Sequence, residues 1–336
     1  MTFDPDAPAA GDGLYGLPTT VDEARVVVLP VPWEATTSYR RGTARGPAAM
    51  MEASFQVDLF DLDVGPAWRH GIASLPADPD VEAWNAEAEP DALLVIESGG
   101  GHPDAAARVN ELSERVNARV YEVAAGLFAR GKIPAILGGD HSVPFGAIRA
   151  AAERHPGLGV LHIDAHADLR RAYEGFTWSH ASIFHNVMTR LPGVGRLVQV
   201  GIRDVGEAEV AMIRESEGRI VTFFDSAIGR ALAGGTTWAS IVARVVERLP
   251  DPVWVSFDVD GLDPSFCPAT GTPVPGGLSF RDVVVLLGEV SRHRRIVGFD
   301  LNEIGDAEWD GNVAARLFYK LCGWSAGASP QGVELP

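Results

Sequence analysis

The chain has 336 residues, of which 46% are hydrophobic, which is enough apolar material for one large domain or two small ones. It carries 28 Lys and Arg residues against 45 Asp and Glu residues, giving a formal net charge of −17 at pH 7. Such a chain repels nucleic acid and anionic lipid and attracts small cations, although solubility alone is the simpler explanation of the charge. We therefore expect neither a nucleic-acid nor a membrane partner.

The two cysteines and the N-terminus give no sign of export. Cys267 and Cys322 are far apart and form no CxxC pair, so we expect neither thiolate metal ligation nor a disulfide framework. The first residues lack the basic start and apolar core of a signal peptide. No apolar run approaches the roughly 20 residues that span a bilayer. These features predict a soluble, cytoplasmic protein.

The pattern along the chain predicts an extended arm, one α/β domain and a short tail. Residues 1–22 are rich in Pro, Gly, Ala and Asp, which is typical of an arm. Apolar runs then predict buried strands at 26–29, 93–96, 133–137, 159–163, 197–200, 220–224, 253–257 and 296–299. Amphipathic stretches between them predict helices, for example at 105–130, 143–154, 207–215, 238–249 and 280–292. This alternation favours a parallel sheet with helices on both faces, in one domain over 23–325 followed by a tail over 326–336.

Three acidic motifs follow predicted strands. They read Gly-Gly-Asp-His-Ser at 138–142, Asp-Ala-His-Ala-Asp at 164–168, and Ser-Phe-Asp-Val-Asp-Gly-Leu-Asp-Pro at 256–264. Side chains two apart on a strand share a face, and ligands bind at the carboxyl ends of parallel strands. We therefore expect six side chains to converge, namely His141, Asp164, His166, Asp168, Asp258 and Asp260.

Four carboxylates and two imidazoles are enough to hold two divalent cations. This oxygen-rich set suits Mn²⁺, with Ni²⁺, Co²⁺ or Fe²⁺ as alternatives. Two such ions lower the pKa of a shared water and make it a nucleophile. Neighbouring polar residues have simpler explanations: we expect Asp140 to hold backbone amides, Asp263 to shape the turn before Pro264, and His162 to be a packed strand histidine rather than a neighbour of the metals.

The three motifs together resemble the signatures of the ureohydrolase family, which includes arginase and agmatinase. Gly42-Thr43 with Gly46-Pro47, and Gly201-Ile202-Arg203-Asp204, are similar to further segments of that family, so the resemblance covers roughly residues 25–323. It implies a three-layer α/β/α sandwich with an eight-stranded parallel sheet. It also implies two Mn²⁺ ions per chain, hydrolysis of a guanidino group by a metal-bridging hydroxide with release of urea, and a homo-oligomer, either trimer or hexamer.

The resemblance also implies roles for single residues. It places one ion on His141, Asp164, Asp168 and Asp258, and the other on Asp164, His166, Asp258 and Asp260, so that Asp164 and Asp258 bridge. Glu303 matches the carboxylate that binds the guanidinium, and His180 matches the histidine that delivers a proton to the leaving amine. We further expect substrate contacts from Asp204 and Trp178, with anchoring of the loop as the alternative for Trp178.

Departures from the family pattern bear on the substrate. The Ser-Ser-Gly-Asn run by which arginases recognise an amino-acid end is absent from 171–180, which disfavours arginine, and Ala181 stands where agmatinases commonly have glycine. The leading hypothesis is an agmatinase-like hydrolase of a cationic guanidino compound, most simply agmatine. Guanidinobutyrase, guanidine hydrolase, arginase, formiminoglutamase and a non-catalytic subunit remain open. A zinc deacetylase is disfavoured, because the chain has no His-His dipeptide.

Overall fold

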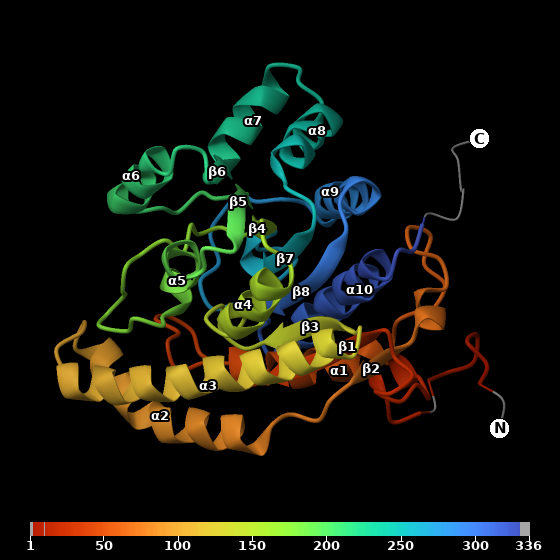
Figure 1. Ribbon diagram of the computed structural model, residues 1–336, viewed down its shortest axis with the longest axis horizontal. Helices are drawn as coiled ribbons and strands as arrows, with labels where there is room; N and C mark the ends of the chain where they lie inside the picture. The colour runs from red at the N-terminus through yellow and green to blue at the C-terminus, as the bar shows by residue number, and fades with distance from the viewer. Residues whose placement is uncertain (1–2, 10, 330–336) are drawn as a thin grey trace.

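The computed structural model, which describes residues 3–9 and 11–329, is built around one sheet of eight parallel strands. The strand order is β2-β1-β3-β8-β7-β4-β5-β6 (Figure 1). The strands are β1 (Val26–Val31), β2 (Ile72–Ser74), β3 (Ile133–Gly138), β4 (Leu158–Ile163), β5 (Val194–Val200), β6 (Ile220–Phe223), β7 (Val253–Asp258) and β8 (Ile296–Asn302). The predicted eight-stranded parallel sheet is therefore confirmed.

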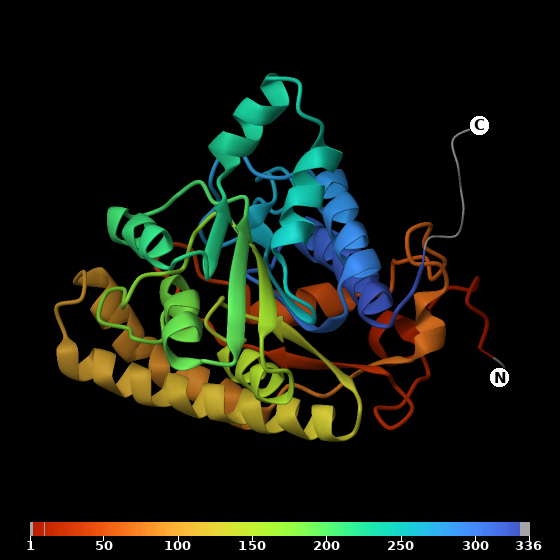
Figure 2. The same ribbon diagram turned by 45° about the horizontal axis from the view of Figure 1, so that its top comes forward.

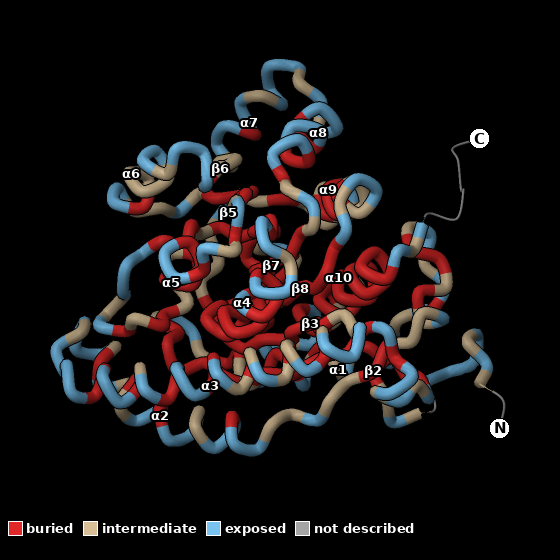
Figure 3. The backbone as a smooth tube through the Cα atoms, viewed as in Figure 1, coloured by how far each residue is buried: buried red, intermediate tan, exposed pale blue. Residues whose placement is uncertain are grey.

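Both faces of the sheet are covered by helices, as the apolar strands require. Alternate residues of each strand point to opposite faces, so Leu161 and Ile163 belong to one core and Val160 to the other. The second core is closed by α2 (Pro79–Glu97), α3 (Pro103–Ala129), α4 (Phe145–Arg154), α5 (Ile183–Arg190) and α6 (Glu207–Glu215). The first is closed by α1 (Gly46–Ser54), α7 (Asp225–Ala233), α8 (Trp238–Arg248), α9 (Phe280–His293) and α10 (Glu308–Ser325). Figures 1 and 2 show these layers, and Figure 3 shows burial concentrated on the sheet and the inner faces of the helices.

One predicted strand is wrong and one strand was missed. Residues 93–96 form the last full turn of α2, where Val95 is buried and Leu94 is exposed, the pattern of an amphipathic helix. Four apolar residues in a row do not distinguish a buried strand from a helix end. The missed strand, β2, has only three residues and pairs with β1 at the sheet edge.

The segment predicted as an extended arm includes a buried turn, η1 (Leu14–Gly16). The Tyr15 hydroxyl donates to the Ala315 carbonyl over 2.8 Å, and its ring packs edge-on against Tyr319 of α10 at 5.0 Å. This part of 1–22 is therefore held against α10, because apolar side chains there are buried. Residues 1, 2 and 10 of that segment, and 330–336 of the predicted tail, lie outside the described residues. Among residues 3–9 and 11–329, none of the helices has the length and apolar character to cross a membrane.

Candidate metal centre and active site

Four adjacent strands, β3, β8, β7 and β4, bring the three acidic motifs together. His141 follows β3, Asp164 follows β4, and Asp258 is the last residue of β7. Because the strands are parallel, their carboxyl ends lie at one edge of the sheet. The Gly138-Gly139 pair allows the close approach there, since a Cβ at Gly139 would lie 1.9 Å from the Trp33 carbonyl oxygen.

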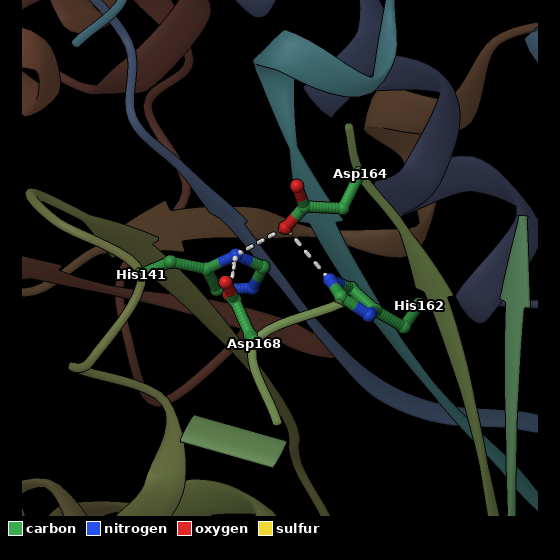
Figure 4. A group of neighbouring side chains, drawn as sticks. All are labelled: His141, His162, Asp164 and Asp168. Atoms are coloured by element: carbon green, nitrogen blue, oxygen red, sulfur yellow. Dashed lines mark hydrogen bonds and ion pairs between the residues drawn. The ribbon is translucent and has the colours of Figure 1, made fainter. Parts of the chain in front are cut away.

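A first group of side chains surrounds the Nδ1 atom of His141. That nitrogen lies 3.0 Å from Oδ2 of Asp164, 3.2 Å from Oδ2 of Asp258 and 3.5 Å from Oδ2 of Asp168. All four side chains are at most 5% exposed. Figure 4 shows the carboxylates of Asp164 and Asp168 both directed at the His141 ring. These are the four residues that the family resemblance groups around one ion.

A second group surrounds the Nδ1 atom of His166. It lies 3.0 Å from Oδ2 of Asp260 and 3.4 Å from Oδ1 of Asp164. Asp164 thus turns one oxygen toward each group, which is the geometry of a bridging carboxylate. Asp258 turns Oδ2 toward His141, while its Oδ1 accepts the backbone N–H of Asp260 over 2.8 Å.

The convergence arises from turns rather than from strand alternation. β4 ends at Ile163, and Asp168 adopts a left-handed φ of 54°, so 164–168 is a loop. Asp260 lies in the 3₁₀ turn η5 (Val259–Gly261), which Asp258 caps. The side chains that the alternation argument expected to converge do lie close together, but the local conformations that bring them together are tight turns.

The unfavourable charge of this cluster fits a pair of cations. Burial and the nearby Asp164 carboxylate raise the pKa of Asp168 well above its ordinary value, and burial and Asp260 do the same for Asp258. Burial opposes ionisation of Asp164 as well, but His162 and His141 hold its pKa well below its usual range. Two divalent ions at these oxygens and Nδ1 atoms would offset the repulsion between the carboxylates. The residues present thus fit a binuclear metal site.

Contacts on the other side of His141 set its ligand atom. Its Nε2 lies 2.9 Å from Ser256 Oγ, whose hydroxyl donates to Asp300 Oδ1 over 2.6 Å. Because that hydroxyl proton is committed to Asp300, Ser256 accepts Nε2–H. Nδ1 of His141 is therefore the nitrogen whose lone pair becomes available to an ion when the ring loses its second proton. Ser256 begins the third motif, but Asp300 lies in β8, and sequence reasoning gave neither of them this role.

We expect the metal-free chain to lose stability as the pH rises above about 6.5, the ordinary pKa of histidine. Despite their burial, carboxylate partners hold the pKa values of His141 and His166 well above normal, and those of Asp168 and Asp258 are raised as well. Groups with raised folded-state pKa values retain protons that the unfolded chain has released, so the free energy of unfolding falls as they titrate.

Other groups titrate below this window. The pKa of Asp164 is depressed, and burial lowers the pKa values of His162 and His180 to about 4, so these groups oppose the trend only at lower pH. Added divalent metal requires deprotonated ligands, so its stabilising effect should grow with pH. Denaturant unfolding at pH 6.5 and 8.5, with chelator or with Mn²⁺, measures the pH dependence of the metal-free stability and of the stabilisation by metal. A chelated chain that becomes more stable at pH 8.5 would contradict this account.

His180 and Glu303 both lie beside the metal-ligand cluster, in different settings. His180 lines a cavity of about 270 Å³ together with His166 and Asp168. Burial lowers the pKa of its imidazole to about 4, below the ordinary value for histidine. Glu303 is buried, with a left-handed φ of 62°, and its Oε1 accepts the backbone N–H of His141 over 2.9 Å. Burial and the Asp258 carboxylate raise its pKa well above the ordinary value.

A residue far away in sequence, Thr36, links His180 to the Gly-Gly-Asp-His-Ser motif at 138–142. Thr36 Oγ1 accepts the His180 backbone N–H over 3.0 Å and donates to Asp140 Oδ2 over 2.8 Å. Asp140 also accepts the backbone N–H of Thr36 and of Ser142, which agrees with its expected role of holding amides. No pattern around Thr36 signals this position, because the contact depends on the fold.

The same cavity contains Asp204 but not Trp178. Asp204 lies in its wall with Tyr39 and Tyr173. Trp178 faces a different hollow on the helical side, where it packs against Phe145 at 4.8 Å and Arg190 lies over its ring at 4.5 Å. Its indole N–H donates to Glu114 of α3 over 3.2 Å. The structure therefore does not bring Trp178 to the substrate cavity, and its contacts support the alternative that it anchors the loop carrying His180.

Comparison with known proteins decides the family. The arginase family profile matches residues 24–323, nearly the whole described chain. The chain belongs to the arginase family. As a member of this family of binuclear-metal ureohydrolases, it is a hydrolase that acts on guanidino C–N bonds, and its buried His/Asp cluster is compatible with the metal site.

Similar members of the arginase family include enzymes with several named substrates. The chain is 35% identical over 305 residues to an N(1)-aminopropylagmatine ureohydrolase of Thermus thermophilus, covering 90% of each chain. It is 32% identical over 296 residues to the proclavaminate amidinohydrolase of Streptomyces clavuligerus, covering 87% of this chain and 84% of that one. The crystal structure of an agmatine ureohydrolase of Thermoplasma volcanium superposes with a TM-score of 0.73 at 25% identity, covering 95% of both chains.

Proposed function

We propose that this arginase-family hydrolase cleaves a cationic guanidino compound of the agmatine type to an amine and urea. The observation that carries the proposal is the cavity: His166, Asp168 and His180 line it together with the carboxylate of Asp204 and the rings of Tyr39 and Tyr173. A carboxylate and aromatic faces attract an alkyl ammonium group. Relatives named for agmatine and aminopropylagmatine support a substrate with a cationic tail.

Six side chains of the chain would hold the metal pair. His141, Asp168 and Asp258 surround the first position and His166 and Asp260 the second, with Asp164 facing both. The ions would supply an activated water as nucleophile for the guanidino carbon. Mn²⁺ suits this oxygen-rich set best, with Ni²⁺ as the alternative.

Two further residues would act on the substrate itself. Glu303, behind the His141 backbone, would accept N–H bonds from the guanidinium and orient its carbon toward the nucleophile. Burial lowers the pKa of His180 to about 4, so its imidazole is neutral at pH 7 and would hold a proton only transiently, passing it from the attacking water to the leaving amine. Thr36 would hold the His180 backbone in place during this transfer.

Asp204→Asn should raise KM for a substrate with a cationic tail by about tenfold, the loss of one charge-assisted contact of about 1.4 kcal/mol. kcat should change little, because Asp204 is in the cavity wall and not among the metal-ligand groups. Steady-state kinetics with agmatine and with uncharged-tail guanidines measure the difference. An equal effect on both substrates would show that Asp204 does not contact the tail. Asp225→Asn, at the start of α7, is the matched control.

A second candidate is a guanidino acid, and one cavity residue favours it. Arg170 lies in the same wall as Asp204. Its guanidinium stacks over Tyr173 at 5.1 Å and is 3.8 Å from Glu209. A substrate carboxylate could bind this guanidinium in place of Glu209, and the similarity to a proclavaminate amidinohydrolase is consistent with such a substrate. Because Arg170 already lies beside Glu209, a guanidino acid is a weaker candidate than a substrate with a cationic tail.

Urea release across a substrate panel tests both candidates. The purified chain is reconstituted separately with Mn²⁺ and Ni²⁺ and given agmatine, N(1)-aminopropylagmatine, arginine, 4-guanidinobutyrate, 3-guanidinopropionate and guanidine. The cationic proposal expects the highest kcat/KM for agmatine or its aminopropyl derivative. Preference for 4-guanidinobutyrate would favour the guanidino-acid candidate. No urea from any compound, with two ions bound, would contradict both.

Two predictions about the protein's setting stay with this proposal. A homo-oligomer, trimer or hexamer, is the assembly that the family resemblance implies, and sedimentation of the purified chain measures it. Cytoplasmic location is supported by the two cysteines, Cys267 and Cys322, which are both buried and unpaired.

A further inference from the structure

His162 is a fully buried histidine on β4 that touches the metal-ligand cluster from the sheet side. Its Nε2 lies 2.7 Å from Oδ2 of Asp164, the same oxygen that faces Nδ1 of His141 (Figure 4). We propose that His162 is a positioning residue, whose Nε2–H bond to Asp164 holds that carboxylate in the bridging orientation. The sequence favoured simple packing for this residue. The inference rests on the metal pair of the proposed function.

The protonation of His162 follows from the group on its far side. The amide nitrogen of Gln199 lies 2.8 Å from the Ala167 carbonyl oxygen, which can only accept, so this atom is a donor nitrogen. The same nitrogen lies 3.0 Å from Nδ1 of His162. Nδ1 must therefore be an acceptor without a proton. The single proton of the imidazole is then on Nε2, where it faces Asp164.

This tautomer makes His162 a partner of a ligand and not itself a ligand. Ligand atoms of His141, His162, Asp164 and Asp168 all lie within 4.8 Å of one another, so distance alone would allow a third histidine ligand. A nitrogen that carries its proton has no lone pair for a cation. His162 thus occupies one acceptor direction of Asp164 Oδ2 and leaves the other for the ion on the His141 side.

The other oxygen of Asp164 is restrained in the same way. Oδ1 accepts the backbone N–H of His166 over 2.6 Å, and it faces Nδ1 of that residue at 3.4 Å. Each oxygen therefore has one protein donor and one direction open toward its own group of ligands. Such a carboxylate is fixed against rotation about its Cβ–Cγ bond, which favours bridging over chelation of a single ion.

The restraint extends across three neighbouring strands. The register places His162 of β4 beside Gln199 of β5, and Gln199 beside Thr222 of β6. Thr222 Oγ1 donates to Gln199 Oε1 over 2.9 Å, which fixes the amide from its other end. The ring of Phe184 lies 4.0 Å from that of His162 and closes the row on its helical side. A row of bonded polar side chains inside an otherwise apolar sheet sets the position of Asp164 through rigid elements.

Metal binding by the purified full chain tests the proposal. His162→Leu removes the donor, and His162→Gln keeps a donor nitrogen near the position of Nε2. We expect the leucine variant to lose about 10- to 100-fold in Mn²⁺ affinity, as for other hydrogen-bond partners of metal ligands, and the glutamine variant to stay within about threefold of the native chain. His155→Leu, at the end of α4, is the matched control and should bind as the native chain does.

Three results would overturn the proposal. Native affinity in a folded His162→Leu chain would show that His162 only packs. Loss of one ion per chain from His162→Gln would indicate that His162 is a direct ligand. If the leucine variant does not fold, ¹⁵N NMR of the histidine-labelled native chain with diamagnetic Zn²⁺ decides: we expect the Nε2–H tautomer, and an Nδ1–H tautomer contradicts the proposal. If the native chain itself binds no Mn²⁺, the proposed metal pair is wrong. That result differs from the three above, which contradict only the role of His162.

Discussion

Asp258→Ala should abolish urea release and metal binding together. We expect kcat/KM for the best substrate of the panel to fall by at least ~10³-fold, beyond the ~10- to 100-fold cost of losing a ligand's hydrogen-bond partner. Asp258 Oδ2 lies 3.2 Å from Nδ1 of His141, and Oδ1 caps the turn that holds Asp260. The substitution therefore removes one ligand and loosens another. Metal content after dialysis and urea release measure the two effects.

The same motif offers a matched control for this experiment. Asp263 lies five residues later and accepts the backbone N–H and hydroxyl of Ser265, away from both ligand groups. Asp263→Ala removes a carboxylate of the same motif and should leave metal content native and activity within about twofold, as for surface substitutions. Retained activity in Asp258→Ala would show that the residues around His141 and His166 do not form the catalytic metal pair.

The candidate ligands could be named from the sequence because each is close to a strand end. A parallel α/β sheet places all strand ends at one edge, so Asp164 and Asp258 were expected near each other before their strand order was known. The order β3-β8-β7-β4 could not be inferred, because long-range pairing leaves no local signal. That order is what places His141 and Glu303 in the same cluster.

The roles of residues that act through another side chain could not be predicted from the sequence. Thr36, Ser256 and Gln199 are ordinary polar residues in apolar or loop segments, and their roles arise from contacts across the fold. Trp178 had two interpretations from the sequence, a substrate contact or an anchor of the loop. The loop turns its ring toward α3, where the indole is buried and its N–H has a hydrogen-bond acceptor, and this supports the anchor.

Glu303→Gln should reduce kcat/KM by about 10²-fold while both ions stay bound. A neutral amide oxygen still accepts the His141 N–H, but a charge-assisted bond to a guanidinium is roughly twice as strong as a neutral one. The substitution is nearly isosteric, which matters because Glu303 is 4% exposed and has a left-handed backbone. A loss of activity without loss of metal would thus report the contact between Glu303 and the substrate rather than a defect in the metal site.

The relative sizes of the KM and kcat changes in Glu303→Gln then show whether the contact between Glu303 and the guanidinium acts in the bound substrate or in the transition state. If Glu303 binds the guanidinium equally before and during the reaction, KM rises and kcat holds; if the contact strengthens as the carbon becomes tetrahedral, kcat falls. We expect both, because the carboxylate orients the planar cation that the nucleophile attacks. Glu308→Gln, at the exposed start of α10, is the matched control and should behave as the native chain. Unchanged kinetics in Glu303→Gln would remove Glu303 from the substrate site, since no other proposed role depends on its charge.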